Sequence, residues 1–205
     1  LESTMQNIAD SIVDQFDHKL ETDEYHALSS FVTYNDRLKT ISVTKKSYLP
    51  GNSLLETPEG CFYDLLRNYH LLFTQYCRFK LPEMVDEETY LNKGPAFMAI
   101  LHPALGPLWS IISQKIVGGV VTDGSELQLE IAELDIKDLK LEGSLIIEAD
   151  NVLGHDQNCQ FHEKCGRCTL KNVTVKNRGI DRTVNNRYWK NEITRHESYK
   201  IRLHG

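Results

Sequence analysis

Four potential metal ligands lie close together in the second half of the chain. In the stretch HDQNCQFHEKCGRC they are Cys159, His162, Cys165 and Cys168. Thiolates and imidazoles are ligands that zinc prefers. Structural zinc sites usually take two ligand pairs from well-separated segments, whereas all four candidates here lie within ten residues. Two alternatives stay open: a structural zinc site, or an exposed loop from which Cys168 turns into the core as a small apolar residue.

A set of basic residues lies earlier in the chain than the four potential metal ligands. It occurs in the stretch NDRLKTISVTKKSY, which contains Lys39, Lys45 and Lys46. Lysine is a compact positive charge suited to phosphate groups, and lysines at a strand end facing a cleft would neutralise a polyphosphate. The alternative is a solvated strand end, the commoner environment of a Lys-Lys pair. The sequence contains no glycine-rich phosphate loop, HExxH motif or Ser/His/Asp arrangement. His102, beside Pro103, is expected to be packed and hydrogen-bonded rather than catalytic.

The basic group depends on a predicted hairpin, with strands at residues 30–34 and 38–44 joined by Asn35-Asp36. Before it, a capping-box pattern at Ser3 and an apolar stripe predict a helix to about Leu20. After it, Thr57-Pro58-Glu59 has the residues typical of a helix start, and an apolar stripe continues the helix to Tyr76.

Short segments of alternating apolar residues fill the chain from Ser125 to Asp181, each ended by a turn. Their apolar positions are Leu127, Leu129, Ile131, Leu134, Ile136, Leu139, Leu141, Leu145, Ile147, Leu170, Val173 and Val175. One such strand cannot bury its own apolar face, so the strands must stack on one another. We favour a β-solenoid over an antiparallel meander. Upstream we predict a surface connection at 80–95, a strand or helix lead-in at 97–101, and a short helix from Leu108 ended by Gly118-Gly119.

Composition narrows the class of protein. The chain has 205 residues, 40% of them hydrophobic, and a net charge of −6, which argues against a broad nucleic-acid-binding face. No apolar run approaches the ~20 residues that span a bilayer. Five cysteines, an odd number, suggest a reducing compartment, with the cytosol as the default and a plastid as the alternative. Because the chain starts at Leu1 rather than at Met, we expect an excised segment.

Several sequence blocks resemble the later part of UDP-glucose pyrophosphorylases, in particular the bacterial and plastid-type group linked to sulfolipid synthesis. These blocks include LLETPEGCFYDLLRN, GPAFMAILHPALGPLWSIISQK and CGRCTLKNVTVKNRGID. The resemblance implies an α+β chain: the end of an α/β nucleotidyltransferase catalytic domain followed by the start of a C-terminal parallel β-helix. The expected boundaries are 1–96 for the catalytic portion, 97–124 for a linker with a short helix, and 125–205 for the β-helix.

The implied reaction makes UDP-glucose and pyrophosphate from UTP and glucose 1-phosphate, with Mg²⁺ bound alongside the nucleotide. The family's glycine-rich UTP loop would lie upstream of Leu1, so the isolated segment is expected to be inactive. In this context Lys39, Lys45 and Lys46 become candidates for binding substrate phosphates. Cys159 and His162 lie outside the resembling blocks, which weakens the case for structural Zn²⁺. Two other functions remain open: a non-catalytic β-solenoid that forms homo-oligomers, and a small zinc-stabilised binding domain.

Overall fold

The computed structural model describes residues 15–19, 21, 36, 39–153 and 165–204, and the chain divides into two compact units, Leu1–Asn35 and Asp36–Gly205. In the first unit the predicted helix lies mostly outside the described residues. Residues 15–19, which are described, are not helical. The rest of this section concerns the second unit.

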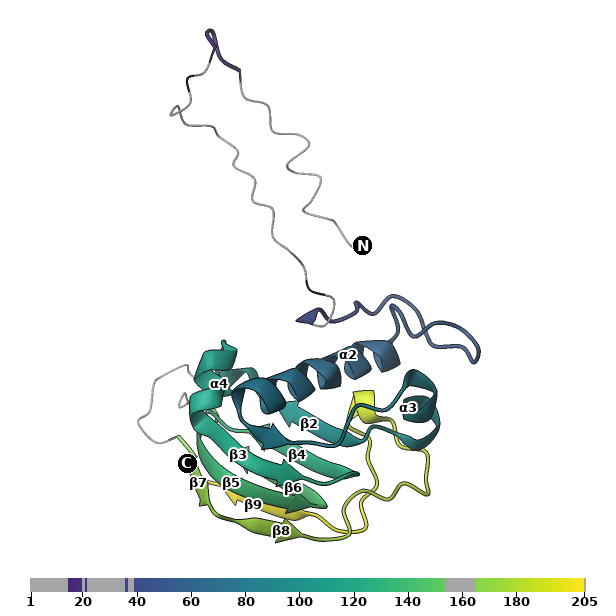
Figure 1. The fold of residues 1–205 in the computed structure, drawn as a ribbon, viewed down its shortest axis with the longest axis vertical. Coiled ribbons are helices and arrows are strands. Elements are labelled where there is room, and N and C mark those ends of the chain that lie inside the picture. Colours follow the sequence, from purple (N-terminus) through teal and green to yellow (C-terminus); the bar gives the residue numbers. More distant parts are fainter. Residues whose placement is uncertain (1–14, 20, 22–35, 37–38, 154–164, 205) are drawn as a thin grey trace. The chain divides into compact units, whose positions relative to one another are not determined.

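Parallel strands build most of this unit (Figure 1). They are β1 (Phe79–Lys80), β2 (Phe97–Leu101), β3 (Ile116–Val121), β4 (Ser125–Glu130), β5 (Glu133–Glu142), β6 (Ser144–Ala149), β7 (Arg167–Lys171), β8 (Thr174–Lys176) and β9 (Tyr199–Leu203). One sheet has the order β1-β3-β5-β7, with β8 also paired to β5, and the other has the order β2-β4-β6-β9. Because the chain visits the two sheets alternately, each circuit, here called a coil, adds to both.

In the middle of the stack the coils are short and contain similar numbers of residues. Ile116 pairs with Ile136, twenty residues later, and Leu127 pairs with Leu145, eighteen residues later. Side chains of alternate residues point inward and form one apolar core between the sheets. The stacking of strands that the sequence predicts from residue 125 is therefore confirmed, and the antiparallel meander is wrong.

One corner of each coil is set by residues in the left-handed backbone region. Arg78, Gly118, Asp138 and Asn172 have φ values of 60°, 71°, 56° and 54°, and the strand register places them in a single column. A bend at the same position in every coil keeps the strands on both sides of it paired. A Cβ at Gly118 would lie 2.7 Å from Asp138 Oδ1, so a side chain at this position would require the Asp138 carboxylate to move.

Helices cover the first coils. They are α2 (Pro58–Leu71), which continues as the π-helical turn η2 (Leu72–Tyr76), α3 (Glu87–Lys93), η3 (Pro103–Leu105), α4 (Trp109–Lys115) and η4 (Tyr188–Lys190). The start predicted for α2 is confirmed: Pro58 occupies the first turn and the Thr57 hydroxyl accepts a hydrogen bond from the Gly60 N–H at 3.1 Å. A second apolar cluster joins α2 and α3 to Met98, whose side chain lies on the outer face of β2.

Three sequence expectations need correction. Residues 40–44 form no strand, because the segment docks through hydrogen bonds to other partners, such as that from Ser42 N–H to Asp64 Oδ2 at 2.9 Å. The other half of the hairpin, residues 30–34, lies outside the described part. The connection at 80–95 contains α3, which Asp86 caps by accepting from the Thr89 N–H at 2.8 Å.

The third correction concerns the glycines expected to end the helix at 108–116. That helix, α4, ends at Lys115, and Gly118 and Gly119 lie inside β3. The helix stops earlier because Ile116 already pairs with Ile136 as a strand residue. The segment 97–124, expected as a linker, thus contains β2 and β3, which pair with β4 and β5.

Candidate functional site

The predicted phosphate-binding lysines lie in the irregular segment before α2. Lys39, Lys45 and Lys46 are all exposed. The backbone N–H groups of Lys45 and Lys46 donate to the Glu56 carbonyl oxygen, and Lys46 Nζ lies 3.8 Å from Glu56 Oε2. The structure therefore fixes the backbone at this pair and leaves both side chains in solvent. Their role in phosphate binding stays a prediction.

Of the four predicted metal ligands, Cys159 and His162 lie outside the described residues. Cys165 is half-buried, whereas Cys168 is buried on β7 within the main core. Burial raises the pKa of the Cys168 thiol, which opposes the thiolate form that zinc binds. In the part of the chain that the structure describes, no group of three His, Cys, Asp or Glu residues is placed to hold a metal ion. The position of Cys168 supports the alternative in which it is a small apolar core residue.

His102 has the structural role expected of it. Its Nδ1 accepts a hydrogen bond from the Ala104 N–H at 3.1 Å and thereby caps η3.

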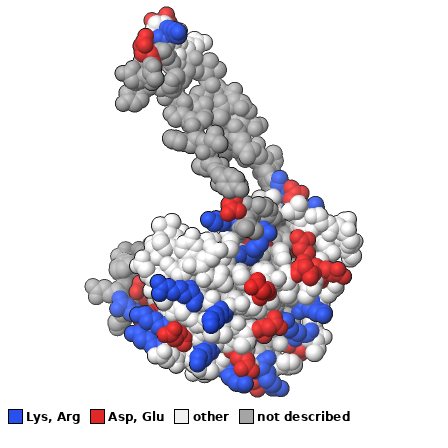
Figure 2. All heavy atoms as spheres, viewed as in Figure 1, with Lys and Arg blue, Asp and Glu red and all other residues white. Residues whose placement is uncertain are grey.

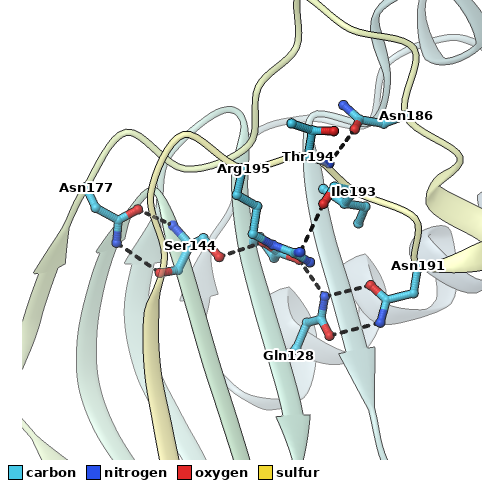
Figure 3. Close-up of polar contacts among 9 residues, drawn as sticks. Gln128, Ser144, Asn177, Asn186, Asn191, Ile193, Thr194 and Arg195 are labelled. Carbon is cyan, nitrogen blue, oxygen red and sulfur yellow. Dashed lines mark hydrogen bonds and ion pairs between the residues drawn. The ribbon is translucent and has the colours of Figure 1, made fainter.

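A buried polar cluster lies on the outer face of β4. At its centre is Glu126, whose side chain is fully buried. Arg195 donates to both of its carboxylate oxygens, from Nε to Oε2 at 2.7 Å and from Nη2 to Oε1 at 2.6 Å. The Ser144 hydroxyl donates to Oε2 at 2.6 Å, and the Gln128 amide donates to Oε1 at 2.5 Å. Figure 3 shows Gln128, Ser144 and Arg195 converging from β4, β6 and the segment after β8.

This cluster holds a long connection against the sheet. Residues 177–198, which we call the strap, run from β8 to β9. Besides Arg195, its Asn191 exchanges side-chain hydrogen bonds with Gln128 at 3.0 and 3.4 Å. At the start of the strap, Asn177 accepts from the Ser144 N–H and donates to the Ser144 carbonyl, both at 2.9 Å. Ile180 and Tyr188 of the strap join the apolar cluster under α2.

Local hydrogen bonds shape the strap itself. Asp181 accepts from the Thr183 hydroxyl and N–H, at 2.6 and 2.9 Å, and these bonds lower the pKa of its carboxyl. Glu197 accepts from the Arg178 N–H and pairs with the Arg178 guanidinium, which lowers the pKa of Glu197. Burial raises the pKa of the Tyr188 phenol. At neutral pH Asp181 and Glu197 are therefore ionised, and the Tyr188 phenol is protonated.

The Glu126 cluster has a structural role and is not arranged for catalysis. Four donors already occupy the two carboxylate oxygens, and Arg195 supplies a full counter-charge. A general base or a metal ligand needs a free lone pair directed at the reacting group. The cluster therefore anchors the strap and is not an acid–base site.

An open cleft of about 590 Å³ lies beside the strap, between the turns at Gly124 and Gly143. Its charged side chains are mutually paired: Lys176 with Glu142 at 3.0 Å, Arg178 with Glu197 at 3.0 Å, and Arg182 with Asp123 at 3.8 Å. Because the charges cancel locally, the cleft lacks the excess positive charge that a nucleoside triphosphate requires.

The sequence analysis did not predict the polar cluster around Glu126. In the segment Glu126-Leu127-Gln128-Leu129 the alternation correctly places the leucines inside and the polar residues outside. The outer face is then expected to be solvent-exposed, but the strap covers it. The ion-pair partner of Glu126, Arg195, is 69 residues away in the sequence. The only available signal was the long polar segment after Val175, beyond which no strand was predicted although β9 lies there.

Comparison with known proteins gives two matches. A family model described as "UGP3-like, C-terminal hexapeptide repeats" matches residues 116–205. The chain is 41% identical over 214 aligned positions, covering all of its length, to UTP--glucose-1-phosphate uridylyltransferase 3, chloroplastic, of Arabidopsis thaliana. The chain spans only 24% of that relative's length. No solved structure matches.

The matches agree with the sequence resemblance and with the fold. The eighteen-residue spacing in one sheet equals three six-residue units, in agreement with hexapeptide repeats, whereas the spacing in the other sheet is twenty residues. Among the described residues no helix is long and apolar enough to cross a membrane. Along its whole length the chain is therefore similar to part of a chloroplast uridylyltransferase, and its residues 116–205 match the family model of UGP3-like C-terminal hexapeptide repeats.

Proposed function

We propose that this chain is the C-terminal part of a uridylyltransferase that makes UDP-glucose and pyrophosphate from UTP and glucose 1-phosphate. Identity of 41% along the whole chain carries the proposal, because it includes the segment before the repeats as well as the repeats. In this interpretation residues 1–96 end the catalytic domain, and the parallel β-helix that follows, to which β2 and β3 already belong, supports that domain. We further propose a plastid location, which organelle fractionation tests against the cytosol.

The reaction needs charge neutralisation more than covalent chemistry. The sugar phosphate oxygen attacks the α-phosphorus in line, and catalysis depends on positioning and on positive charge around the phosphates. From this chain we propose that Lys39, Lys45 and Lys46 supply such charge. Mg²⁺ neutralises phosphate charge in such reactions, but the described residues include no cluster suited to hold it. We expect the isolated chain to be inactive, because its sequence contains no glycine-rich loop for UTP.

The test is pyrophosphate release from UTP and glucose 1-phosphate by the longer protein that contains this chain. Replacing both lysines in Lys45→Ala/Lys46→Ala should lower kcat/KM by at least about a hundredfold, since charge that stabilises a phosphoryl-transfer transition state is usually worth that much. The matched control is Lys140→Ala, which removes an equally exposed lysine from β5. An unchanged rate in the double variant would remove these lysines from the mechanism. No UDP-glucose formation by the longer protein would remove the proposed activity.

A second candidate function, an interaction module, is favoured by the end of the stack. Within the described chain, β7, β8 and β9 each pair with another strand on one side only. Unpaired strand edges are sites where other chains add. Light scattering tests whether the chain forms homo-oligomers: a strict monomer at high concentration contradicts self-association through the repeats.

The zinc-stabilised domain is tested separately by metal analysis of protein purified without chelator. Less than about a tenth of an equivalent of zinc would exclude it, because a structural site is occupied stoichiometrically.

A further inference from the structure

Besides the sheet, the strap contacts the helices that precede the stack. Its helical turn η4 packs against α2, and in Figure 1 this turn lies between α2 and α3. Tyr188 of η4 is 6% exposed and belongs to the apolar cluster that also contains Phe62 and Leu66 of α2. A Cβ on Gly94, at the end of α3, would overlap the Tyr188 hydroxyl. The Tyr188 side chain therefore fills the space between the two helices.

Tyr90 of α3 connects this contact to the first turn of α2. Its hydroxyl donates to the Glu59 carbonyl at 3.1 Å, and its ring centroid lies 5.1 Å from that of Tyr63. Burial raises the pKa of the Tyr90 phenol, and the nearby Glu59 and Tyr188 add to the shift, so the hydroxyl remains a donor. Figure 2 shows acidic side chains exposed over α3, whereas Tyr90 is only 2% exposed. The helix therefore contacts α2 through Tyr90.

The loop that carries Lys45 and Lys46 docks on the same turn of α2. The backbone N–H groups of both lysines donate to the Glu56 carbonyl oxygen, at 2.8 and 3.1 Å. Two residues earlier in the chain, Leu54 is 4% exposed and belongs to the apolar cluster under α2. A Cβ on Gly60 would overlap the Leu54 carbonyl oxygen, so the loop and the helix touch through backbone atoms. The position of the two lysines therefore depends on the packing around the first turn of α2.

We propose that Tyr188 is a positioning residue: acting through the first turn of α2, it fixes the loop that presents Lys45 and Lys46 to the substrate phosphates. This role rests on the uridylyltransferase function proposed above. Packed side chains and hydrogen bonds form a continuous set of contacts from the strap to this loop. Since the Glu126–Arg195 pair attaches the strap to the sheet, the stack is the support that holds the lysines in place. A displacement of about 1 Å at such a site can cost about a hundredfold in rate.

Hydrogen exchange in the 205-residue chain tests these contacts without an activity assay. In Tyr188→Leu, exchange of the Lys45 and Lys46 amides should become at least about tenfold faster, because the first turn of α2 loses its support, whereas amides in the middle of β4 and β5 should stay within about twofold. Tyr188→Phe keeps the ring and should restore slow exchange. The matched control is Tyr199→Leu, which changes an exposed tyrosine on β9 and should alter neither set of amides.

A second variant keeps the packing intact. Tyr90→Phe removes only the hydroxyl that donates to the Glu59 carbonyl, and it should make exchange of the two lysine amides at least about threefold faster. Kinetics of the longer protein that contains this chain test the role in the reaction. Tyr188→Leu should lower kcat for UDP-glucose formation at least about tenfold and leave KM for UTP within about threefold, because the lysines act on the transition state. Tyr199→Leu should leave both constants unchanged.

The outcomes separate this role from the proposed function. Unchanged exchange at Lys45 and Lys46 in Tyr188→Leu, or equally faster exchange in β4 and β5, would reduce Tyr188 to an ordinary core residue and overturn the positioning role. An unaltered kcat in Tyr188→Leu, with an active wild type, would overturn it as well. A wild-type longer protein that forms no UDP-glucose would instead remove the proposed function, and this role with it.

Discussion

Replacing Glu126 with glutamine should destabilise the protein without changing its shape. Glutamine keeps the volume of the side chain and one acceptor oxygen, but it removes the negative charge and turns one acceptor into a donor. That new NH₂ group must face donors that now serve the carboxylate, from Arg195, Ser144 or Gln128. The change therefore removes the ion pair with Arg195, and it also places the new amide N–H donors next to other hydrogen-bond donors.

The size of the effect follows from burial. The Glu126 side chain is 0% exposed and that of Arg195 is 20% exposed, so water cannot fully solvate the guanidinium once its partner is gone. Breaking a buried ion pair by changing one member costs about 3–5 kcal/mol. Because Arg195 keeps some exposure, we expect the lower end, about 3 kcal/mol. In a chain of this size this corresponds to a melting temperature lower by about 6–12 °C.

The assay is urea unfolding followed by circular dichroism, with the midpoint compared at constant slope. A control is Arg178→Gln, which breaks the exposed pair with Glu197 and should cost less than about 0.5 kcal/mol. Arg195→Met should cost at least as much as Glu126→Gln, because it leaves a carboxylate fully buried with no counter-charge. The double variant Glu126→Gln/Arg195→Met should cost less than the two single changes combined. A loss below about 1 kcal/mol in Glu126→Gln would refute the anchoring role of the pair.

Three other changes have outcomes set by local geometry and are measured by the same unfolding assay. Thr57→Ala removes the cap of α2 at a buried position, where the hydroxyl also donates to the Leu54 carbonyl at 2.6 Å, and should cost about 1–2 kcal/mol, whereas Thr57→Ser should cost less; equal losses would show that the hydroxyl is not the important group. Asn172→Gly should be neutral or stabilising and Asn172→Val destabilising by about 1–2 kcal/mol, because φ at this corner is 54°; the reverse order would contradict the left-handed corner. Burial raises the pKa of the Cys77 thiol to about 12 from 9.0 in the unfolded chain, so the folded state retains this proton longer, and the stability that it contributes is complete below pH 9 and is lost as the pH rises toward 12. Between pH 9 and 11 the wild type should therefore lose about 1 kcal/mol per pH unit more than Cys77→Ala, and parallel pH curves would exclude this linkage.

Local patterns predicted the elements whose signals lie within a few residues. The start of α2 was readable because Thr57, Pro58 and Glu59 each act on the first turn of their own helix. The strands from residue 125 were readable because alternation of apolar residues is itself the condition for burying one face. The resemblance to uridylyltransferases added the order of the parts, and the matches confirm that relationship.

The errors occurred where an element depends on a distant partner. Residues 40–44 have a strand-like composition, but in the described chain Ser42 donates to the helix side chain of Asp64 and accepts from the Glu56 N–H in place of pairing with a neighbouring strand. Gly118 and Gly119 resemble a helix stop, yet β3 continues through them because Asp138 bends β5 at the matching position. In both cases the pairing partner decides the conformation, and spacing along the chain does not identify that partner.

The charge on the strands illustrates the same limit and also what the register adds. In the sequence, the acids of β5 and the bases of β7 and β8 look like ordinary solvated positions of amphipathic strands, because each charge is considered only with its neighbours along the chain. Once Glu142 is aligned with Lys176, and Glu148 with Arg202, the same residues form an acidic layer beneath a basic one. Lysines at a sheet edge also oppose the addition of another basic strand. The register thus reveals a charge pattern across the strands that spacing along the chain does not show.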